Sequence, residues 1–383
     1  MRKISRYSRA FMADPRKSIQ FAGKKLGGLG QRFDYHLLGR WGLSRRIRVV
    51  HIELTHRCNL RCLMCFFFGL DRDVTESAHG AQYRSQEELT LAQLKGFLDE
   101  VAHFRPAIGL TGGEPMLSPH CLDVVRLVKG KRLNCGLTTN GTLLSGFAEE
   151  IVASKLDWLS LSLDGPDNIH DRIRGVPGTF RRLTNGVDLI QQMKKRKKAK
   201  TPEIGIKFTL VGDNYRYLEE TIQLAVGLGA THFTATHLFF CTEEMARRHN
   251  QEFGPDIPCS AGALEGLQRL DPLEAARILP KIRKKKWPLT LRFIPDLTRE
   301  EILTYYDEPA RFVKAKVCRR PWNICNILPN GDVLPCLNFV AGNLKNAPFS
   351  EIWNGRRYRT FRQILHREGA FPACARCCGM FDL

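Results

Sequence analysis

Three cysteines, Cys58, Cys62 and Cys65, lie close together in the run THRCNLRCLMC. They directly follow an apolar stretch, residues 49–54, that is typical of a buried strand. A cubane iron–sulfur cluster is normally held by four thiolates, so three on one loop leave one iron with an open coordination position. The spacing alone leaves a zinc knuckle, a disulfide pair or buried thiols as alternatives.

A second segment that could do chemistry is the run IGLTGGEPML, in which Gly112, Gly113, Glu114 and Pro115 end a short apolar stretch. Two adjacent glycines allow the backbone to come close to a ligand, and a carboxylate beside them can accept hydrogen bonds from an ammonium group. On its own the run indicates only a turn. Downstream of the three cysteines, it becomes a candidate ligand-binding loop.

The C-terminal region carries a second set of thiols, Cys318, Cys336, Cys374 and Cys377. The first two flank an expected hairpin whose turn, residues 329–332, contains Asn-Gly, and the last two form a CxxC loop. Four ligands make a closed site that would cross-link a small domain with little core of its own. Zinc and iron–sulfur clusters both accept four cysteines, so the set alone does not choose between them.

The CxxxCxxC spacing followed by GGEP resembles the radical S-adenosylmethionine (SAM) superfamily. The resemblance implies a [4Fe–4S] cluster on the first three cysteines, with SAM chelating the open iron through its amino and carboxylate groups. It also implies reductive cleavage of SAM to a 5′-deoxyadenosyl radical. The implied cofactor-binding residues are Gly112, Gly113, Glu114, Pro115, Asn140, Ser162 and Arg174. Among them Glu114 and the glycine backbone would meet the amino group and Arg174 the carboxylate, with Arg172 as the competing choice.

The second cysteine set, with the Gly-Asn-Leu step at 342–344 and the stretch EIW, resembles the SPASM and twitch auxiliary-cluster domains. The sequence ends soon after Cys377, and the later cysteines of a full SPASM domain do not follow. We therefore expect one auxiliary [4Fe–4S] cluster on Cys318, Cys336, Cys374 and Cys377, with Cys325 or Cys378 as substitute ligands. An acid that serves some relatives as a base is replaced by Leu337 and Asn338, so no catalytic base is assigned.

Short apolar runs alternate with helix-like segments from residue 49 onward, which predicts a parallel sheet with crossover helices. Six strands are expected, at 49–54, 107–110, 135–138, 158–163, 203–210 and 231–236. Helices are expected at 89–104, 119–128, 143–154, 180–194 and 217–228. The candidate ligands follow the ends of these strands, where parallel α/β folds bind ligands. The fold class is therefore α/β, and six units fit the partial (β/α)6 TIM-like barrel of the resembled family.

We expect four regions: a basic extension at 1–46, the radical SAM core at 47–240, a connector at 241–310 and a small cluster-binding domain at 311–383. The connector is rich in proline and should contain only short helices. Its Cys241 and Cys259 have no partner at metal-ligand spacing, and we interpret them as buried or incidental thiols. Tyr305 and Tyr306 are interpreted as packing residues.

The formal net charge is +20, and the basic residues are dense in the first 46 positions. This excess favours contact with an anionic membrane or another polyanion. The chain shows no signal peptide, no apolar run long enough to cross a membrane and no recognised nucleic-acid reader motif. Thirteen cysteines without a signal fit metal clusters in a reducing compartment. We expect a cytoplasmic protein, either soluble or in peripheral contact with a membrane.

The leading interpretation is an enzyme that abstracts hydrogen from an unactivated C–H bond, with the auxiliary cluster aiding net oxidation or cross-linking. Its substrate, a lipid, glycan, peptide or small molecule, is not indicated, because a fold does not fix a function. Flavodoxin or ferredoxin is the expected electron donor. Two alternatives stay open: a polyanion-binding protein with structural metal sites, and a non-catalytic cluster carrier.

Overall fold

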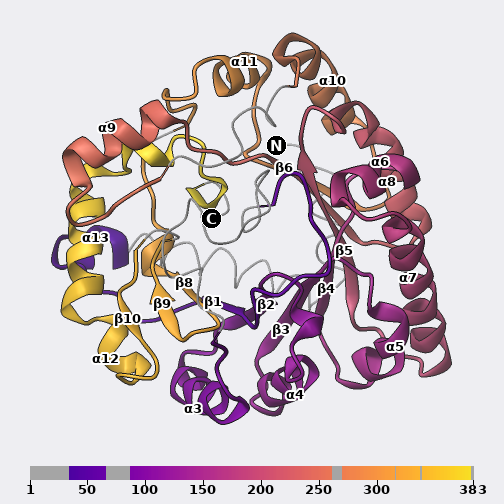
Figure 1. Ribbon diagram of the computed structural model, residues 1–383, viewed down its shortest axis with the longest axis horizontal. Coiled ribbons are helices and arrows are strands. Elements are labelled where there is room, and N and C mark those ends of the chain that lie inside the picture. Colours follow the sequence, from indigo (N-terminus) through magenta and orange to yellow (C-terminus); the bar gives the residue numbers. More distant parts are fainter. Residues whose placement is uncertain (1–33, 66–86, 261–269, 315, 337–338, 381–383) are drawn as a thin grey trace, which may run out of the picture.

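The computed structural model describes residues 34–65, 87–260, 270–314, 316–336 and 339–380. Its centre is one sheet with the strand order β10-β9-β8-β1-β2-β3-β4-β5-β6-β7. Figure 1 shows this sheet curved into an open ring with the helices outside it. The strands are β1 (Val49–Glu53), β2 (Ala107–Thr111), β3 (Asn134–Thr139), β4 (Trp158–Ser162), β5 (Glu203–Leu210), β6 (His232–His237), β7 (Thr290–Ile294), β8 (Ile324–Ile327), β9 (Asp332–Leu334) and β10 (Gly342–Asn343).

Strands β8 and β1 to β7 are all parallel, so their carboxyl ends meet at one rim of the ring. The six predicted strands are β1 to β6, and their positions are confirmed to within one residue at each end. The partial barrel is longer than six units, because β7 extends it beyond β6 and β8 extends it beyond β1. Residues 241–310 thus contain a strand of the barrel, which the expectation of a connector with short helices missed.

Helices α3 to α8 and α10 connect or cover the parallel strands, and Figure 1 places them on the outer side of the ring. The helices are α3 (Leu91–Val101), α4 (Cys121–Gly130), α5 (Leu144–Ala153), α6 (Asp167–Arg174), α7 (Thr179–Arg196), α8 (Leu218–Gly227), α9 (Glu243–Phe253), α10 (Pro272–Lys284), α11 (Arg299–Asp307), α12 (Phe349–Trp353) and α13 (Arg356–Glu368). Thr90 begins α3 with a capping box that Gln93 completes, as the predicted start near residue 89 requires.

Alternation along the strands sorts side chains between the outer and the inner face of the ring. In β4, Leu159 and Leu161 are fully buried, while the alternating Ser160 and Ser162 are only half-buried. The apolar set packs in one core with residues of α5 and α7. The polar set therefore faces the concave side, which is where a ligand of the barrel would lie.

The C-terminal region packs on the β1 edge of the barrel around a buried arginine. The Arg362 guanidinium stacks over the Trp353 and Tyr358 rings, 4.1 Å from each centroid. It donates to the carbonyls of Pro321 (2.9 Å) and Gly42 (3.1 Å), so it joins α13 to segments on both sides of the sheet edge. The predicted hairpin is confirmed as β8 and β9, which pair antiparallel on either side of the turn.

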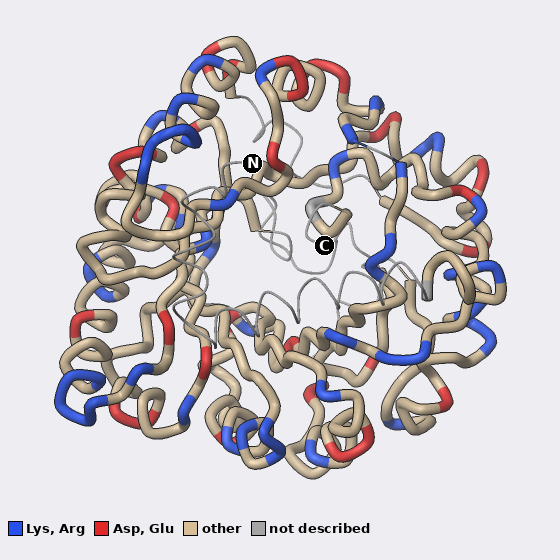
Figure 2. The backbone as a smooth tube through the Cα atoms, turned by 180° about the vertical axis from the view of Figure 1, so that it is seen from behind, with Lys and Arg blue, Asp and Glu red and all other residues tan. Residues whose placement is uncertain are grey.

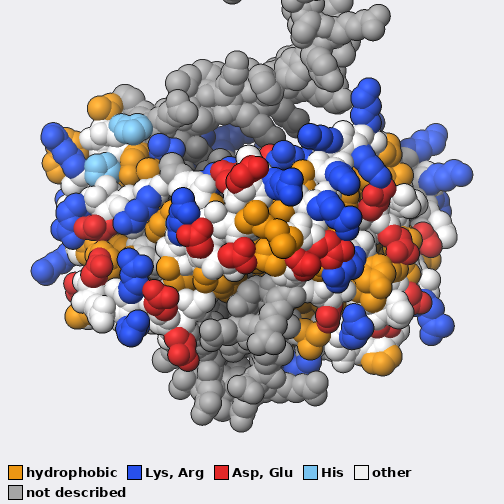
Figure 3. Space-filling view, turned by 90° about the horizontal axis from the view of Figure 1, so that it is seen from above, with side chains coloured by type: hydrophobic (Ala, Val, Ile, Leu, Met, Phe, Trp, Pro, Cys, Tyr) orange, Lys and Arg blue, Asp and Glu red, His pale blue; other side chains and the backbone are white. Residues whose placement is uncertain are grey.

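Charged side chains are distributed over the outer surface. Figure 2 shows Lys and Arg on nearly every peripheral helix, with Asp and Glu among them, and Figure 3 shows basic, acidic and apolar side chains interleaved on the face that it presents. Most of the basic extension, residues 1–33, lies outside the described residues. Among the helices that the structure describes, none is long and apolar enough to cross a bilayer.

Candidate active site

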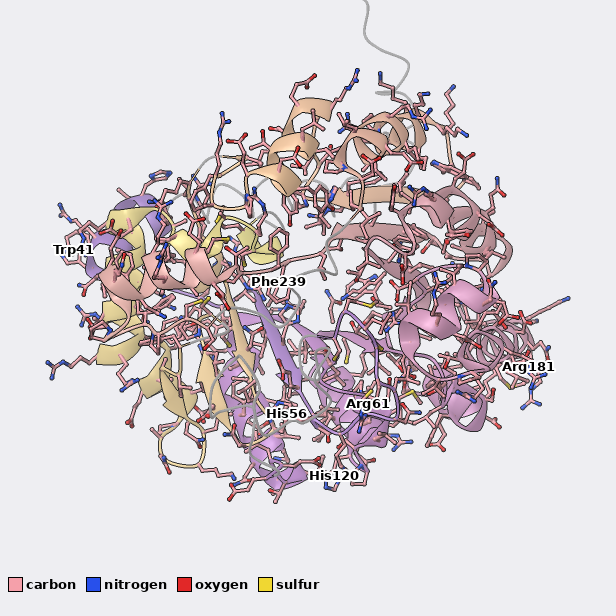
Figure 4. The ribbon with its side chains drawn as sticks, turned by 45° about the horizontal axis from the view of Figure 1, so that its top comes forward. Trp41, His56, Arg61, His120, Arg181 and Phe239 are labelled. Atoms are coloured by element: carbon pink, nitrogen blue, oxygen red, sulfur yellow. The ribbon has the colours of Figure 1, made fainter. Side chains whose placement is uncertain are left out.

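The three cysteines lie on the loop that leaves the carboxyl end of β1, and backbone hydrogen bonds hold this loop to α6. Leu63 N–H donates to the Ile173 carbonyl (2.9 Å), and Arg61 N–H donates to the Arg174 carbonyl (3.3 Å). Gly175 ends α6 with a φ of +74°, and a Cβ there would lie 2.4 Å from the Arg61 carbonyl oxygen. The loop, labelled at its His56 and Arg61 in Figure 4, is thus positioned by the α6 end.

The thiols of Cys58, Cys62 and Cys65 are half-buried and none is in a disulfide. Burial raises the pKa of Cys58 to about 11, and the nearby Cys62, Glu114 and Cys65 groups add to this rise. A thiol in this setting ionises only when a cation replaces its proton, as a metal does. Three half-buried thiols on one loop are a donor set that fits a cluster with one open iron position.

Gly112 and Gly113 allow the GGEP loop to lie directly on the start of the cysteine loop. Gly113 N–H donates to the Thr55 carbonyl and Glu114 N–H to the Arg57 carbonyl, both at 2.8 Å. A Cβ on Gly113 would lie 2.4 Å from the Arg57 carbonyl oxygen, and Gly112 has a φ of +136°. The two glycines thus permit a close approach to the backbone of the neighbouring loop, and the close approach to a ligand expected from the sequence stays a prediction.

The Glu114 carboxylate is fully buried and accepts three hydrogen bonds from the protein. Its Oε1 accepts from Thr139 Oγ1 (2.7 Å) and Met116 N–H (3.0 Å), and its Oε2 accepts from Asn140 N–H (2.8 Å). Burial raises its pKa, and these three donors oppose the rise. Glu114 thus ties the end of β2 to the end of β3, while Pro115 begins the short helical turn Pro115–Leu117. Its expected contact with the amino group of SAM stays a prediction.

Asn140 lies between the end of β3 and the cysteine loop. Its side-chain Nδ2 donates to Asn59 Oδ1 (2.9 Å) and lies 4.0 Å from Cys58 Sγ. Its Oδ1 accepts from Thr142 N–H (2.9 Å), so the amide orientation is fixed at both ends. The structure therefore brings this predicted cofactor residue to the first cysteine.

Arg174 points at the second cysteine. Its guanidinium pairs with the buried Asp164 carboxylate, and Nη1 lies 3.5 Å from Cys62 Sγ. Burial alone would lower the Arg174 pKa, but Asp164 and Cys62 raise it, so the group is a permanent cation. Arg172, the competing candidate, is more than half exposed and lies 3.8 Å from Asp213. Asp164 lies two residues after the end of β4 in the run SLDGP, and the sequence analysis assigned it no role.

Ser162 ends β4 on the concave face, and its register partner on β5 is Lys207. Lys207 is exposed although it lies in the middle of a central strand, and its Nζ donates to Thr138 Oγ1 on β3 (3.2 Å). Its long side chain thus reaches across β4 on the inner side of the ring. A lysine inside the otherwise apolar run EIGIKFTL is a signal that the sequence reasoning did not use.

A second cation, Arg320, lies at the β1 edge of the same concave face. Its Nη2 donates to Asn326 Oδ1 (3.4 Å), and Asn326 is the register partner of His51 on β1. Burial lowers the pKa of His51 to about 3, and Arg320 and Lys207 lower it further. The imidazole is therefore neutral, and His51 in the strand VVHIE is another polar residue whose placement the sequence reasoning missed.

The four cysteines of the second set come together beside the β8–β9 hairpin. Burial raises the pKa of Cys318 to about 12, with Cys377 and Cys336 adding to the rise, and Cys374 is raised by burial and by all three other thiols. Cys336, Cys374 and Cys377 line one cavity of about 70 Å³. Four thiols that raise one another's pKa in a largely buried setting fit a closed cluster site.

Cys325, one suggested substitute ligand, lies elsewhere. It is fully buried in β8, where its charged neighbours are Arg362 and Arg320, and its role as a substitute ligand stays a prediction. The side chain of Cys378 and the Leu337–Asn338 pair lie outside the described residues. Cys241 and Cys259, expected to be incidental, prove to be neighbours, with their sulfurs 3.8 Å apart in the wall of the same cavity.

Known proteins resemble this chain in the parts that carry both cysteine sets. The model of the radical SAM superfamily matches residues 52–225, and that of the SPASM iron–sulfur cluster-binding domain matches residues 318–378. The AdoMet-dependent heme synthase of Methanosarcina barkeri is 29% identical over 347 residues, which cover 86% of this chain and 88% of that protein. The pre-heme d1 synthase of Dinoroseobacter shibae is 28% identical over 324 residues, covering 80% and 73%.

Among solved structures, Streptococcus suis SuiB bound to its precursor peptide SuiA superposes with a TM-score of 0.61 at 15% identity, covering 97% of this chain and 82% of that one. This likeness extends the shared fold over the barrel and the C-terminal region. The two family matches together cover more than half of the chain and include every cysteine of both sets. The chain is a member of the radical SAM superfamily, an enzyme with a SPASM domain that uses a [4Fe–4S] cluster with SAM and auxiliary iron–sulfur chemistry.

Proposed function

We propose that this enzyme removes hydrogen from a tetrapyrrole with carboxylate side chains, and so oxidises it. The observation that carries the proposal is the basic concave face, where Lys207 and Arg320 flank the neutral His51. His51 lies on β1, the strand that leads into the three-cysteine loop. Lysine and arginine side chains bind carboxylates by charge-assisted hydrogen bonds. The two relatives described above are named for tetrapyrrole products, heme and pre-heme d1.

We also propose which residues hold the cofactors. Cys58, Cys62 and Cys65 would hold the SAM-binding cluster, and Cys318, Cys336, Cys374 and Cys377 would hold one auxiliary cluster. When bound, these groups supply hydrogen abstraction from an unactivated C–H bond and a one-electron acceptor. The predicted division into an extension, a core, a connector and a cluster domain stays a proposal, because one sheet runs through the last three.

The protein's own part is to orient and to exclude water. Arg174 places a positive charge beside Cys62, and Asn140 places an amide dipole beside Cys58. Glu114 accepts from the Asn140 N–H and so holds the GGEP loop to the end of β3. Arg320 acts electrostatically on both His51 of β1 and Cys318 of the C-terminal set. A substrate whose carboxylates bind Lys207 and Arg320 would then lie on the concave face, where we propose that both clusters reach it.

We further propose that flavodoxin or ferredoxin reduces the enzyme and that the N-terminal region meets an anionic membrane. Leu37 and Trp41, at the edge of the basic extension, are 50% and 42% exposed, and Arg40 stacks on the Trp41 ring. Figure 4 places Trp41 at the periphery of the molecule. Aromatic and basic side chains together are suited to a membrane interface.

The test uses the anaerobic, cluster-loaded enzyme with SAM, a reductant and iron coproporphyrin III, which carries four propionates. The proposal expects 5′-deoxyadenosine to form together with a change in porphyrin mass that requires SAM. The tetramethyl ester of the same porphyrin is the matched control, because it keeps the ring and removes the charges. If the ester binds and reacts as well as the free acid, the carboxylate part of the proposal is wrong. If neither reacts while a peptide substrate is modified, the tetrapyrrole part is wrong.

A further inference from the structure

Two cysteines outside both cluster sets, Cys241 and Cys259, hold their sulfurs 3.8 Å apart. This is contact distance for two sulfur atoms, and a disulfide requires them to approach to about 2.05 Å. The two sulfurs must therefore come roughly 1.8 Å closer for a bond to form, and rotation of the cysteine side chains is the movement that would bring them together. The 18-residue spacing gave no hint of this contact, because it depends on how the chain folds back along α9.

Each of the two cysteines is fixed at one end of α9. Cys241 precedes Thr242, whose hydroxyl caps the helix by accepting from Met245 N–H (3.3 Å). Cys259 lies on the segment that returns along the helix, where the Asn250 side chain accepts from its N–H (2.8 Å) and donates to its carbonyl (2.6 Å). This two-point clamp holds the backbone of Cys259 against Asn250 in the C-terminal half of α9.

Cys241 and Cys259 form part of the wall of the cavity beside the C-terminal cysteine set, which we call the auxiliary cavity. The same cavity of about 70 Å³ is lined by Cys336, Cys374 and Cys377. Aromatic residues close the rest of it, among them Phe239, which Figure 4 labels near the centre of the molecule, and Phe371. Figure 1 shows α9 beside the C-terminal segment that carries the last of these cysteines.

We propose that Cys241 and Cys259 form a reversible dithiol–disulfide pair beside the auxiliary cluster. The oxidant is a small-molecule disulfide, RSSR. The half-buried Cys241 thiol, whose pKa is raised by the hydrogen bond with Cys259 and by burial, must first lose its proton; its sulfur then attacks one sulfur of RSSR, which forms a mixed disulfide and releases one RS⁻. The Cys259 thiolate then attacks the Cys241 sulfur, forms the protein disulfide and releases the second RS⁻. The two protons of the protein thiols end on the two RSH products, so two electrons pass from the pair to RSSR.

The two cysteines have unequal roles in this sequence. Cys241 is half-buried and is the sulfur that a reagent reaches first, whereas Cys259 is only 7% exposed and acts as the resolving thiol. Cys121 and Cys135 are the internal comparison, because both are buried thiols of the barrel and lie outside the auxiliary cavity. The proposal does not depend on the substrate class, since it concerns only this cavity wall.

The experiment treats the anaerobic, cluster-loaded protein with hydroxyethyl disulfide, traps remaining thiols by alkylation in denaturant and maps the peptides by mass spectrometry. The expected result is a Cys241–Cys259 cross-link, lighter by two hydrogen atoms, which excess 2-mercaptoethanol reverses, while Cys121 and Cys135 stay alkylated. In Cys259→Ser, Cys241 should keep a stable hydroxyethylthio adduct. In Cys241→Ser, Cys259 should stay unmodified.

Two results would overturn the proposal. One is a wild-type protein in which Cys241 acquires the adduct and no cross-link follows, because Cys259 then fails to resolve it. The other is a loss of about four irons from the Cys241→Ser or Cys259→Ser protein, measured before any oxidant is added, since that would make these thiols cluster ligands. Both readouts are independent of turnover, so they also separate this proposal from the proposed function.

Discussion

The guanidinium of Arg174 lies 3.5 Å from the sulfur of Cys62 and pairs at the same time with the Asp164 carboxylate. Asp164 in turn accepts from Thr209 N–H (2.8 Å) on β5. A fixed positive charge is thus held beside the three-cysteine loop by a carboxylate at the end of β4. This relationship links the cluster loop to the middle of the barrel, and it can be tested without the substrate.

Removal of Arg174 should destabilise the fold, because it leaves the Asp164 charge buried without its partner. Arg174→Met is expected to lower the free energy of unfolding by about 3–5 kcal/mol, and Asp164→Asn should recover part of that loss in the double variant. Denaturant unfolding of the wild type, the two single variants and the double variant gives the coupling free energy between Arg174 and Asp164. The control is Arg172→Met, whose exposed pair with Asp213 should matter by less than about 0.5 kcal/mol. Equal effects of the two arginine variants would show that Arg174 is not the buried partner.

A methyl group on Gly113 should displace the cysteine loop. Its Cβ would lie 2.4 Å from the Arg57 carbonyl oxygen and 2.5 Å from that of His56, which is backbone that cannot rotate away. Gly113→Ala should therefore lose stability and bind less iron after reconstitution. Gly96→Ala is the matched control, since Gly96 lies on the exposed face of α3 and a Cβ there would meet no atom within 4 Å, and it should stabilise the protein by about 0.5–1 kcal/mol. Full iron content in Gly113→Ala would contradict the close packing.

Acid should weaken the fold through His237. Burial lowers its pKa from 6.5 to about 3, and its Nδ1 lies 2.7 Å from the Tyr306 hydroxyl. Between these two pKa values the unfolded chain binds a proton that the folded protein does not, so stability falls as pH falls from 6.5 toward 3. The slope is about 1.4 kcal/mol per pH unit for each such proton. His237→Asn should flatten this slope in urea titrations, and an unchanged slope would argue that His237 is protonated in the fold.

Loss of the concave-face cations should weaken substrate binding and leave both clusters in place. Lys207→Met and Arg320→Met are each expected to raise the Kd for iron coproporphyrin III about tenfold to a hundredfold, because each removes a hydrogen bond from a charged donor. Fluorescence quenching or difference absorption measures the Kd. Lys284→Met removes the same charge from exposed α10 and should change nothing. A similar loss in all three variants would indicate a general charge effect instead of a site.

The sequence predicted what depends on local pattern. Apolar runs that precede each ligand loop were enough to place β1 to β6, and Asn330–Gly331 was enough to place the hairpin. Strand β7 was missed because its run TLRFI is short, lies between Pro288 and Pro295 and carries Arg292. Its identity as a strand depends on its pairing with β6, and this pairing cannot be predicted from the local sequence.

For the candidate site too, the local motifs could be predicted from the sequence and the contacts between distant segments could not. The cysteine motifs were visible because their ligands are close in sequence. The partners of Glu114 come from β3, the charge of Arg174 is balanced from the end of β4, and Cys241 meets Cys259 across α9. These contacts arise from the strand order and from the return of the chain along a helix. Because these contacts depend on tertiary packing, they cannot be predicted from local patterns in a single sequence.

The central claim is that Cys58, Cys62 and Cys65 hold the cluster that acts on SAM while the four C-terminal cysteines hold another. The most direct measurement is anaerobic reconstitution of the wild type and of the Cys58/Cys62/Cys65→Ala variant, with iron counted and 5′-deoxyadenosine assayed after reduction. The account predicts about eight irons and cleavage for the wild type, and about four irons and no cleavage for the variant. Zinc in place of iron, or cleavage that survives in the variant, would contradict it.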